Sequence, residues 1–433
     1  MSKPLFVISC PFDTFSGYGA RSRDLVKAII ETDKYEVKLL SQRWGNTPFG
    51  FCKSNQEWEF LLTHMLTDGN LQKQPDIWMQ ITVPNEFQPV GKFNIGCTAG
   101  IESNICPGDW IEGINRMNLT LVSSNHSKKV FEDCTFEKRD KNTNQLQSTV
   151  KLEKPVEVLF EGANTDIYKV LDKIPQSDLY DSLMGVKEKF AYLFVGHWME
   201  GDMGEDRKNV GLLVKAFLET FKNKMNKPAL ILKTAQVGSS YVDREEILKK
   251  IKKIKKTVNS KNLPNIYLLC GDFSDSEMNE LYNHPKVKAM VNLTKGEGFG
   301  RPLLEFSLTK KPIICSGWSG QTDFLDSKLS CLLGGQLTNV HPSTRNQFLV
   351  PESKWFSPDN GQIGFYLKDV FENYKNYTEN AKRQGSKNKN EFSWEAMSKK
   401  VDNLFTQYIP EFPKEVKLEL PKIEIPKLKK VNG

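Results

Sequence analysis

Short apolar runs alternate with helix-like stretches along most of the chain, and this alternation limits the possible folds more than any other feature. The first series opens with an apolar run at 5–9, a glycine-containing loop, and apolar residues at helical spacing over 22–32. Its further strand candidates lie at 35–40, 77–81, 93–98, 119–123 and 156–160. A second series has strand candidates at 190–196, 229–233, 266–269, 289–293 and 312–315. Such alternation predicts an α/β fold with mostly parallel sheets covered by helices.

The length of 433 residues exceeds one ordinary core, and two domains suit the two repeated series. We expect an N-terminal domain at 1–170 and a C-terminal domain at 171–390, with a helix at about 392–410 that could pack back on the first domain. The polar stretch 137–155 is predicted to be an exposed excursion or flexible loop. The tail 411–433 alternates apolar with charged residues and carries prolines, which favours an extended arm over a docking peptide.

The charge balance permits a polyanionic partner without demanding one. Lys and Arg number 60 against 53 Asp and Glu, a net charge of +7. The lysine-rich stretch 245–258 is favoured as the solvated face of a helix, with a phosphate-binding stripe as the alternative.

The eight cysteines form no CxxC pair, which favours buried free thiols in a reducing compartment. Because no run approaches the ~18 apolar residues of a membrane span and the N-terminus lacks a signal-peptide pattern, we expect a cytoplasmic protein without a transmembrane segment.

The sharpest local feature is the glycine-rich sequence at 295–305, Lys-Gly-Glu-Gly-Phe-Gly-Arg-Pro-Leu-Leu-Glu. It follows a predicted strand and leads into a helix that is expected to begin at about Pro302. Glycines let backbone N–H groups approach a ligand, and the N–H groups and dipole of a helix start favour a phosphate. Glu297 in the turn and Glu305 about one turn into the helix can then address hydroxyl groups of the same ligand.

These two glutamates, separated by seven residues, resemble the E-x7-E signature of retaining GT-B glycosyltransferases, and their context resembles glycosyltransferase family 4. Further similar stretches lie at 100–110, 122–124, 275–282 and 317–323. The resemblance covers most of the chain except 137–155 and the tail, and the whole sequence looks like glycosyltransferases carried by tailed bacteriophages, which would place it in the host cytoplasm. It implies a GT-B fold, in which two Rossmann-like domains face a central cleft. The first domain would bind the acceptor and the second the nucleotide sugar.

The resemblance implies roles for the residues of the glycine-rich sequence. Glu297 would contact hydroxyls of the donor sugar and Glu305 would hold the ribose, since a carboxylate accepts two hydroxyl hydrogen bonds well. The backbone around the turn would border the diphosphate, at Gly298, Phe299, Gly300 and Arg301. Neither glutamate is assigned as a nucleophile.

A second group of site candidates follows the strand at 190–196. In the family a basic pair here neutralises the leaving diphosphate, and Lys208 matches one member of that pair. The other position, commonly an arginine, is His197, so either Arg207 or His197 is left as the second cation. Cations at a helix start conflict with the helix dipole, and a bound anion would resolve that conflict.

Candidates in the first half complete the predicted site. The loop at 16–19, with Gly17 and Gly19, resembles the family's loop beside the donor phosphate, and Arg21 and Arg23 are expected to face the cleft with it. Glu102 lies at the family's acceptor position, where it could act as a general base or position the acceptor. His126 is expected to cap or flank a helix rather than to react.

The predicted mechanism retains the anomeric configuration, with the acceptor hydroxyl attacking on the face from which the diphosphate leaves. No metal or other cofactor is expected, because no DxD-type pair is suitably placed and cationic side chains can replace a divalent ion. The acceptor is open: a glycan is ranked slightly ahead of a hydroxymethylated base in duplex DNA. A non-catalytic binding protein of the GT-B shape is a further alternative, and a dehydrogenase is disfavoured by the lack of a GxGxxG opening. The donor base and sugar and the oligomeric state are not predicted.

Overall fold

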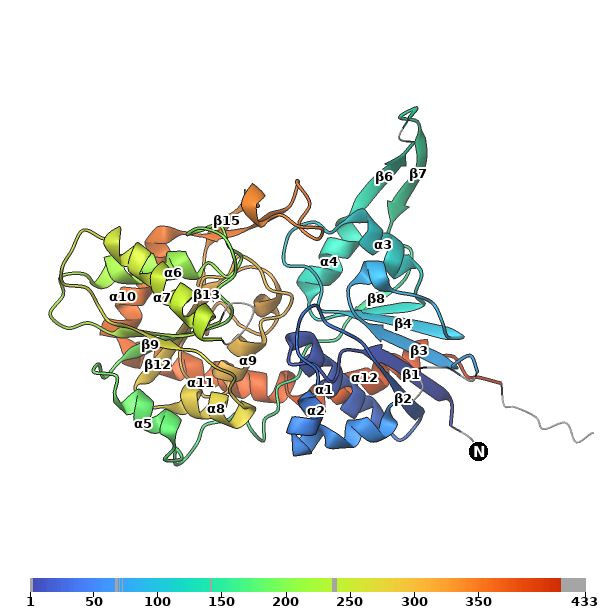
Figure 1. The fold of residues 1–433 in the computed structure, drawn as a ribbon, viewed down its shortest axis with the longest axis horizontal. Helices are drawn as coiled ribbons and strands as arrows, with labels where there is room; N and C mark the ends of the chain where they lie inside the picture. Colours follow the sequence, from blue (N-terminus) through green and yellow to red (C-terminus); the bar gives the residue numbers. More distant parts are fainter. Residues whose placement is uncertain are drawn as a thin grey trace, which may run out of the picture.

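The computed structural model describes residues 3–66, 69, 71, 73–140, 142–235 and 240–413. Two six-stranded parallel sheets form the centres of two halves of the molecule (Figure 1). The first sheet has the order β2-β1-β3-β4-β5-β8. Its strands are β1 (Leu5–Cys10), β2 (Glu36–Ser41), β3 (Ile77–Ile81), β4 (Phe93–Thr98), β5 (Leu119–Val122) and β8 (Val156–Val158). These strands begin within two residues of the predicted apolar runs, which confirms the α/β class and the parallel arrangement.

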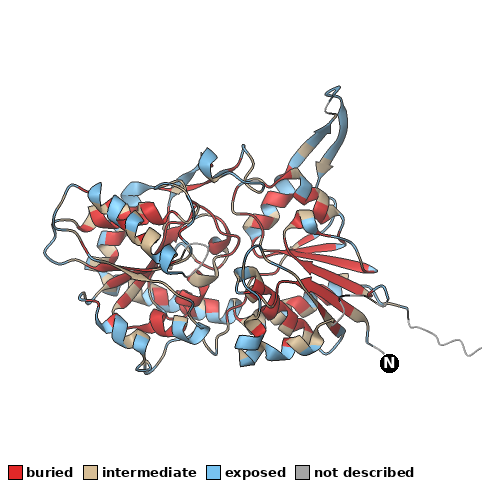
Figure 2. Cartoon of the chain, in the orientation of Figure 1, coloured by how far each residue is buried: buried red, intermediate tan, exposed pale blue. Residues whose placement is uncertain are grey.

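Helices cover both faces of the first sheet, so its central strands are buried throughout, as a parallel sheet requires (Figure 2). The helices of this half are α1 (Gly17–Glu31), α2 (Phe51–Ser54), η1 (Gln56–His64), η2 (Pro84–Glu86), α3 (Gly108–Asn115) and α4 (Asn125–Asp133). Ser16 caps α1 and Ser124 caps α4, each with a side-chain oxygen that accepts from a backbone N–H of the first turn. The capped helix starts therefore follow the loops at the carboxyl ends of β1 and β5.

The second sheet repeats this arrangement with the order β11-β10-β9-β12-β13-β14. Its strands are β9 (Ala191–Val195), β10 (Ala229–Lys233), β11 (Ile266–Leu269), β12 (Val287–Asn292), β13 (Ile313–Ser316) and β14 (Cys331–Leu333). Its helices are α5 (Asp178–Met184), α6 (Val210–Phe221), α7 (Tyr241–Lys256), α8 (Asp275–Asn283), α9 (Arg301–Ser307) and η3 (Gly320–Asp323). Helix α7 buries Ile247, Ile251 and Ile254 and exposes most of its lysines, which fits the solvated face predicted for it.

Two antiparallel hairpins were not predicted. The stretch expected to be an excursion is exposed, and its first part is the hairpin β6 (Thr135–Arg139) and β7 (Leu146–Lys151), which projects from the first half (Figure 1). The second hairpin joins β15 (Gly335–Asn339) to β16 (Lys354–Pro358), with η4 (Pro342–Thr344) in its loop. It reaches the first half, where the Lys354 N–H donates to Asn104 Oδ1 at 2.6 Å.

Three helices close the described chain: α10 (Asn360–Glu372), α11 (Tyr374–Glu391) and α12 (Trp394–Tyr408). Asn373 leaves the helical conformation and separates α10 from α11. Helix α12 lies against α1 of the first half, and Trp394 Nε1 donates to the Asp24 carbonyl at 3.3 Å. From residue 414 onward the predicted tail arm lies outside the described residues.

Two further properties bear on the sequence predictions. Within the described segments, none of the helices is both long and apolar enough to cross a bilayer. All eight cysteines are free thiols, and all but Cys270 are buried. The domain boundaries remain a prediction, although the first sheet ends at Val158 and the second begins at Ala191.

Candidate active site

The glycine-rich sequence forms the strand, turn and helix that were predicted for it. It follows β12, and α9 begins at Arg301 with Pro302 in its first turn. Gly300 has φ +101°, a conformation that favours glycine. A Cβ on Gly298 would lie 2.3 Å from the Ala99 carbonyl oxygen, in the loop that follows β4. The turn therefore packs directly against the first half of the molecule.

Glu297 lies at the centre of this contact and is bound by two cations. Lys208 Nζ donates to both of its carboxylate oxygens, at 2.6 and 2.9 Å, and Arg207 NH1 donates to Oε2 at 3.3 Å. Both cations come from the loop between β9 and α6, and all three side chains are largely buried. The structure thus brings together the predicted sugar contact and the predicted basic pair.

The charges of this group depend on one another. Burial acts to raise the pKa of Glu297, but Lys208 and Arg207 outweigh burial and the pKa is lowered. Burial lowers the pKa of Lys208, and Glu297 only partly restores it. The expected conflict between these cations and the start of α6 is therefore answered by the carboxylate of Glu297. A ligand anion is not required to explain the two cations in this state.

Glu102 reaches the same group from the first half. Its Oε1 lies 3.4 Å from Arg207 NH2, and its side chain is about one-third exposed (34%). A Cβ on Gly296 would lie 1.9 Å from the Glu102 carbonyl oxygen, so the loop of Glu102 and the glycine turn touch at the backbone as well. Arg207 thereby joins a carboxylate of each half.

Glu305 forms a second buried group with different partners. Arg301 Nε donates to its Oε1 at 2.9 Å, and the Tyr282 hydroxyl lies 3.5 Å from its Oε2. Arg301 also donates from NH1 to Asp24 of α1 at 2.7 Å, which ties the second half to the first. Burial, with help from the nearby carboxylate of Asp275, raises the pKa of Glu305 to about 7.

The loop at the start of α1 differs in part from expectation. Gly17 is exposed, with open space where a Cβ would lie, whereas the Gly19 N–H is used by the helix cap at Ser16 Oγ. The expectation that Arg21 and Arg23 face the cleft is wrong. Arg21 donates to the carbonyls of residues 159 and 160, and Arg23 donates to the carbonyls of residues 12 and 14. These guanidinium groups satisfy loop carbonyls inside the first half.

The two histidines occupy different settings. His197 follows β9 and is exposed. His126 lies in the first turn of α4, as expected, with Nε2 3.2 Å from the Ser103 carbonyl oxygen and its ring edge against Trp318. Burial lowers the pKa of His126 to about 4, so it is neutral at physiological pH.

Asp206 and Asn209 flank the basic pair and were not predicted. Both are about 99% buried, and the Asn209 N–H donates to Asp206 Oδ2 at 2.9 Å. Asp206 Oδ1 and both amide atoms of Asn209 have no hydrogen-bond partner among the described residues. Burial raises the pKa of Asp206. The acidity of this loop is visible in the sequence, but the burial of these two side chains is not.

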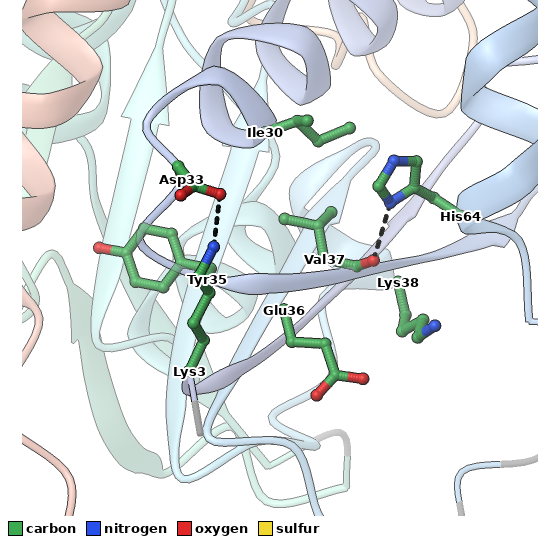
Figure 3. A pocket seen from close by; sticks show the side chains of 8 residues that line it. All are labelled: Lys3, Ile30, Asp33, Tyr35, Glu36, Val37, Lys38 and His64. Carbon is green, nitrogen blue, oxygen red and sulfur yellow. Dashed lines mark hydrogen bonds and ion pairs between the residues drawn. The ribbon is translucent and has the colours of Figure 1, made fainter. Parts of the chain in front are cut away.

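A separate hollow of about 450 Å³ lies along β2 (Figure 3). Figure 3 shows Lys3 paired with Asp33 on one side of it and His64 bonded to the Val37 carbonyl on the other. It contains none of the predicted site residues. Among the residues that the structure describes, no group of three or more His, Cys, Asp or Glu side chains is placed to hold a metal ion.

Comparisons with known proteins show which solved structures have a similar fold. No family model and no curated protein matches the chain. Among solved structures, sucrose-phosphate synthase from Thermosynechococcus elongatus is similar, with a TM-score of 0.61 and 12% identity over 94% of this chain and 98% of that one. A glycosyltransferase from Rickettsia africae gives 0.60 and 14% over 94% and 99%. Anabaena HepE in complex with UDP-glucose gives 0.55 and 12% over 93% and 100%. The chain therefore has the GT-B fold of two Rossmann-like domains, as predicted.

Proposed function

We propose that this chain is a glycosyltransferase that moves a sugar from a nucleotide-sugar donor to an acceptor hydroxyl. The observation that carries the proposal is the placement of two buried carboxylates on one glycine turn and its helix, Glu297 against the basic pair of Arg207 and Lys208, and Glu305 against Arg301. Buried charges are costly unless they are paired, so such a cluster at the contact between two domains indicates a functional site. The Rickettsia africae structure with the same fold is named a glycosyltransferase, which supports this class.

In the proposed donor complex, Glu305 accepts hydrogen bonds from the ribose and Glu297 from the sugar. The turn from Gly298 to Arg301 would border the diphosphate, with the N–H groups at the start of α9 facing it. HepE, which shares the fold, was solved with UDP-glucose, and this supports a nucleotide sugar as the donor class. The donor would enter between Glu297 and its cations, which exchange one anionic partner for another.

Lys208 and Arg207 would neutralise the negative charge that develops on the departing diphosphate. Preorganised cations in a buried site stabilise such charge strongly, which allows a reaction without a divalent ion. With neither glutamate assigned as a nucleophile, the acceptor hydroxyl would attack on the face that the diphosphate leaves, and the anomeric configuration would be retained. Glu102, which lies 3.4 Å from Arg207, would position that hydroxyl or accept its proton.

A glycan remains the favoured acceptor, and a hydroxymethylated base in duplex DNA is the alternative. The lysine-rich helix α7 belongs to the second half of the molecule, whereas the chain segment that carries Glu102 belongs to the first. Electrophoretic mobility shift with duplex DNA at rising salt tests the choice. Tight binding at low salt that fades steeply would overturn the glycan.

The proposed activity is tested by incubating the protein with UDP-, GDP-, ADP- and TDP-linked sugars and detecting released nucleoside diphosphate by mass spectrometry. We expect at least one donor to be hydrolysed, and Glu305→Ala to abolish the release. The exposed Glu352→Ala is the matched control and should behave as the unmodified protein. Failure of every donor, or unchanged release by Glu305→Ala, would favour a non-catalytic binding protein.

A further inference from the structure

We propose that Asn104 is a positioning residue, which uses the edge of strand β16 to hold Glu102 at a fixed place beside Arg207. Asn104 lies two positions after Glu102 in the loop that follows β4. Strand β16 belongs to the hairpin that reaches from the second half of the molecule to the first (Figure 1). The inference rests on the proposed function, because Glu102 is assigned a part only in that reaction.

Asn104 and Lys354 exchange two hydrogen bonds. The Lys354 N–H donates to Asn104 Oδ1 at 2.6 Å, and the Asn104 N–H donates to the Lys354 carbonyl at 3.0 Å. The two residues are 250 positions apart and belong to different halves of the molecule. Two bonds between the same two residues restrict their relative orientation as well as their distance. The loop that carries Glu102 is therefore fixed to β16 in one arrangement.

Strand β16 uses the same edge to contact the glycine turn of the second half. The Phe356 N–H donates to the Lys295 carbonyl at 2.8 Å. Residues two positions apart in a strand direct their backbone groups to the same edge, so Lys354 and Phe356 present one edge to partners in the two halves. Trp355 between them is buried, and Lys295 Nζ lies 4.8 Å from the centre of its ring. The strand is thus anchored where it makes the two contacts.

These two contacts set the spacing of two carboxylates. Asn104 lies two positions after Glu102, and Lys295 lies two positions before Glu297. Arg207 contacts both carboxylates, at 3.4 Å from Glu102 and at 3.3 Å from Glu297. An ion pair with a partly exposed carboxylate contributes little, so Arg207 alone would not hold Glu102 in place. The backbone edge of β16 supplies the fixed frame that the ion pair lacks.

The residue before Asn104 is tied to β16 by a second route. His126 donates from Nε2 to the Ser103 carbonyl at 3.2 Å, since a carbonyl can only accept. The His126 ring lies edge-on to Trp318, with centroids 4.5 Å apart. Trp318 in turn stacks on Phe356 of β16, with centroids 6.2 Å apart and an interplanar angle of 10°. Both neighbouring positions of the loop therefore depend on the same strand.

Hydrogen exchange of the full chain, resolved to single amides by mass spectrometry, tests the contact without reference to activity. We expect Asn104→Ala to speed exchange of the Lys354 amide about fivefold, because the acceptor of that N–H is removed. Asn104→Asp keeps an oxygen at this place and should retain the protection. Asn104 is exposed, so neither change should unfold the protein. The matched control is Asn376→Ala on α11, which removes an exposed asparagine and should change nothing.

Release of nucleoside diphosphate from UDP-, GDP-, ADP- and TDP-linked sugars tests the positioning role. Asn104→Ala should lower kcat about tenfold and leave the KM for the donor unchanged, because it displaces Glu102 and not the donor group. Asn104→Asp should restore most of the rate. When Glu102→Ala is already present, Asn104→Ala should have no further effect, since a residue that acts through Glu102 then has nothing to position.

Three results would overturn the proposal: the Lys354 amide exchanges equally in Asn104→Ala and the unmodified protein, the loss of rate appears in KM, or the loss is the same with and without Glu102. Failure of the proposed function gives a different result, in which the unmodified protein releases nucleoside diphosphate from no donor. Faster exchange of the Lys354 amide in that case would leave β16 as a structural tie between the halves and would remove the positioning role of Asn104.

Discussion

Glu297 and Glu305 are two carboxylates buried to a similar degree, 7% and 6% exposed, but their surroundings give them opposite pKa shifts. Glu297 accepts three hydrogen bonds from two cations that lie beside it. Glu305 accepts one from Arg301, and Arg301 is shared with Asp24. Burial acts to raise the pKa of both carboxylates, and the nearby cations outweigh burial at Glu297 but not at Glu305.

The consequences at neutral pH differ accordingly. Glu297 is ionised, because its pKa lies below the usual range. Glu305, with a pKa of about 7, is divided between its ionised and protonated forms. A protonated carboxyl group accepts fewer hydrogen bonds from ribose hydroxyls, so nucleotide binding should depend on pH through Glu305 and not through Glu297. The following variants test this difference, from the largest expected effect to the smallest.

Glu297→Ala should lower the free energy of unfolding by about 3 to 5 kcal/mol, because it leaves two buried cations without their shared partner. The measurement is denaturant unfolding at pH 7.5. Glu352→Ala removes an exposed carboxylate and should change the unfolding free energy by less than about 0.5 kcal/mol. Equal effects of the two variants would mean that the ion pairs of Glu297 contribute nothing to stability.

Lys208→Met should slow release of nucleoside diphosphate by about 10² to 10³-fold, since it removes a preorganised cation from the leaving group. Initial rates with the hydrolysed donor measure this. Lys224→Ala, on an exposed turn after α6, should leave the rate as it is. If Lys208→Met changed only the KM for the donor, the residue would bind the ground state and not the departing charge.

Glu305→Gln should remove a pH dependence of stability that the unmodified protein shows between about pH 4.5 and 7. The folded pKa of Glu305 is raised from 4.5 to about 7, so the folded state binds more protons in this window and the contribution to stability is lost as the pH rises. A shift of this size corresponds to about 3 kcal/mol, gained by the glutamine variant relative to the unmodified protein between pH 4.5 and 8.

Thermal unfolding at pH 4.5, 6.5 and 8 measures this effect, and nucleotide titrations over the same range should show affinity rising with pH only in the unmodified protein. The carboxylate of Glu297 behaves in the opposite way. Its pKa is lowered, so its contribution is present above the unfolded value and is lost only at acidic pH. Identical pH profiles for Glu305→Gln and the unmodified protein would contradict the comparison.

Local patterns were sufficient to predict most of the fold. The apolar runs at 77–81, 93–98, 229–233 and 266–269 coincide with strands, because each is a short buried segment between clear turn signals. The glycine turn was also predictable, since its glycines are required by backbone contacts and by the positive φ of Gly300. The hairpin of β15 and β16 was missed because β15 is exposed and mostly polar, and β16 offers only the short apolar pair Trp355 and Phe356.

The ion pairs that join side chains of the first half to side chains of the second half could not be predicted from the sequence. Asp24 lies on α1, 277 positions from Arg301, and nothing in its local sequence separates it from a solvent-facing helical acid. The same holds for the pairing of Glu102 with Arg207. Arg21 and Arg23 show the converse error, because charged residues beside a glycine loop were assigned to a ligand, whereas the structure uses them for buried carbonyls. The residue types in the sequence were enough to predict charged and hydrogen-bonding groups at the site. Which of these groups pair with one another depends on contacts between segments that are distant in the sequence.

Asp24→Asn tests whether the shared use of Arg301 explains the raised pKa of Glu305. Asp24 adds to the negative charge near Glu305, and its removal leaves Arg301 to that carboxylate alone. The midpoint of the pH dependence of nucleotide binding should therefore move to lower pH, by less than about one unit. Asp33→Asn, at an exposed pair with Lys3, is the control and should not move it. A midpoint that stays in place or rises would mean that Asp24 does not help to raise the pKa of Glu305, and the contrast with Glu297 would then rest on Lys208 and Arg207.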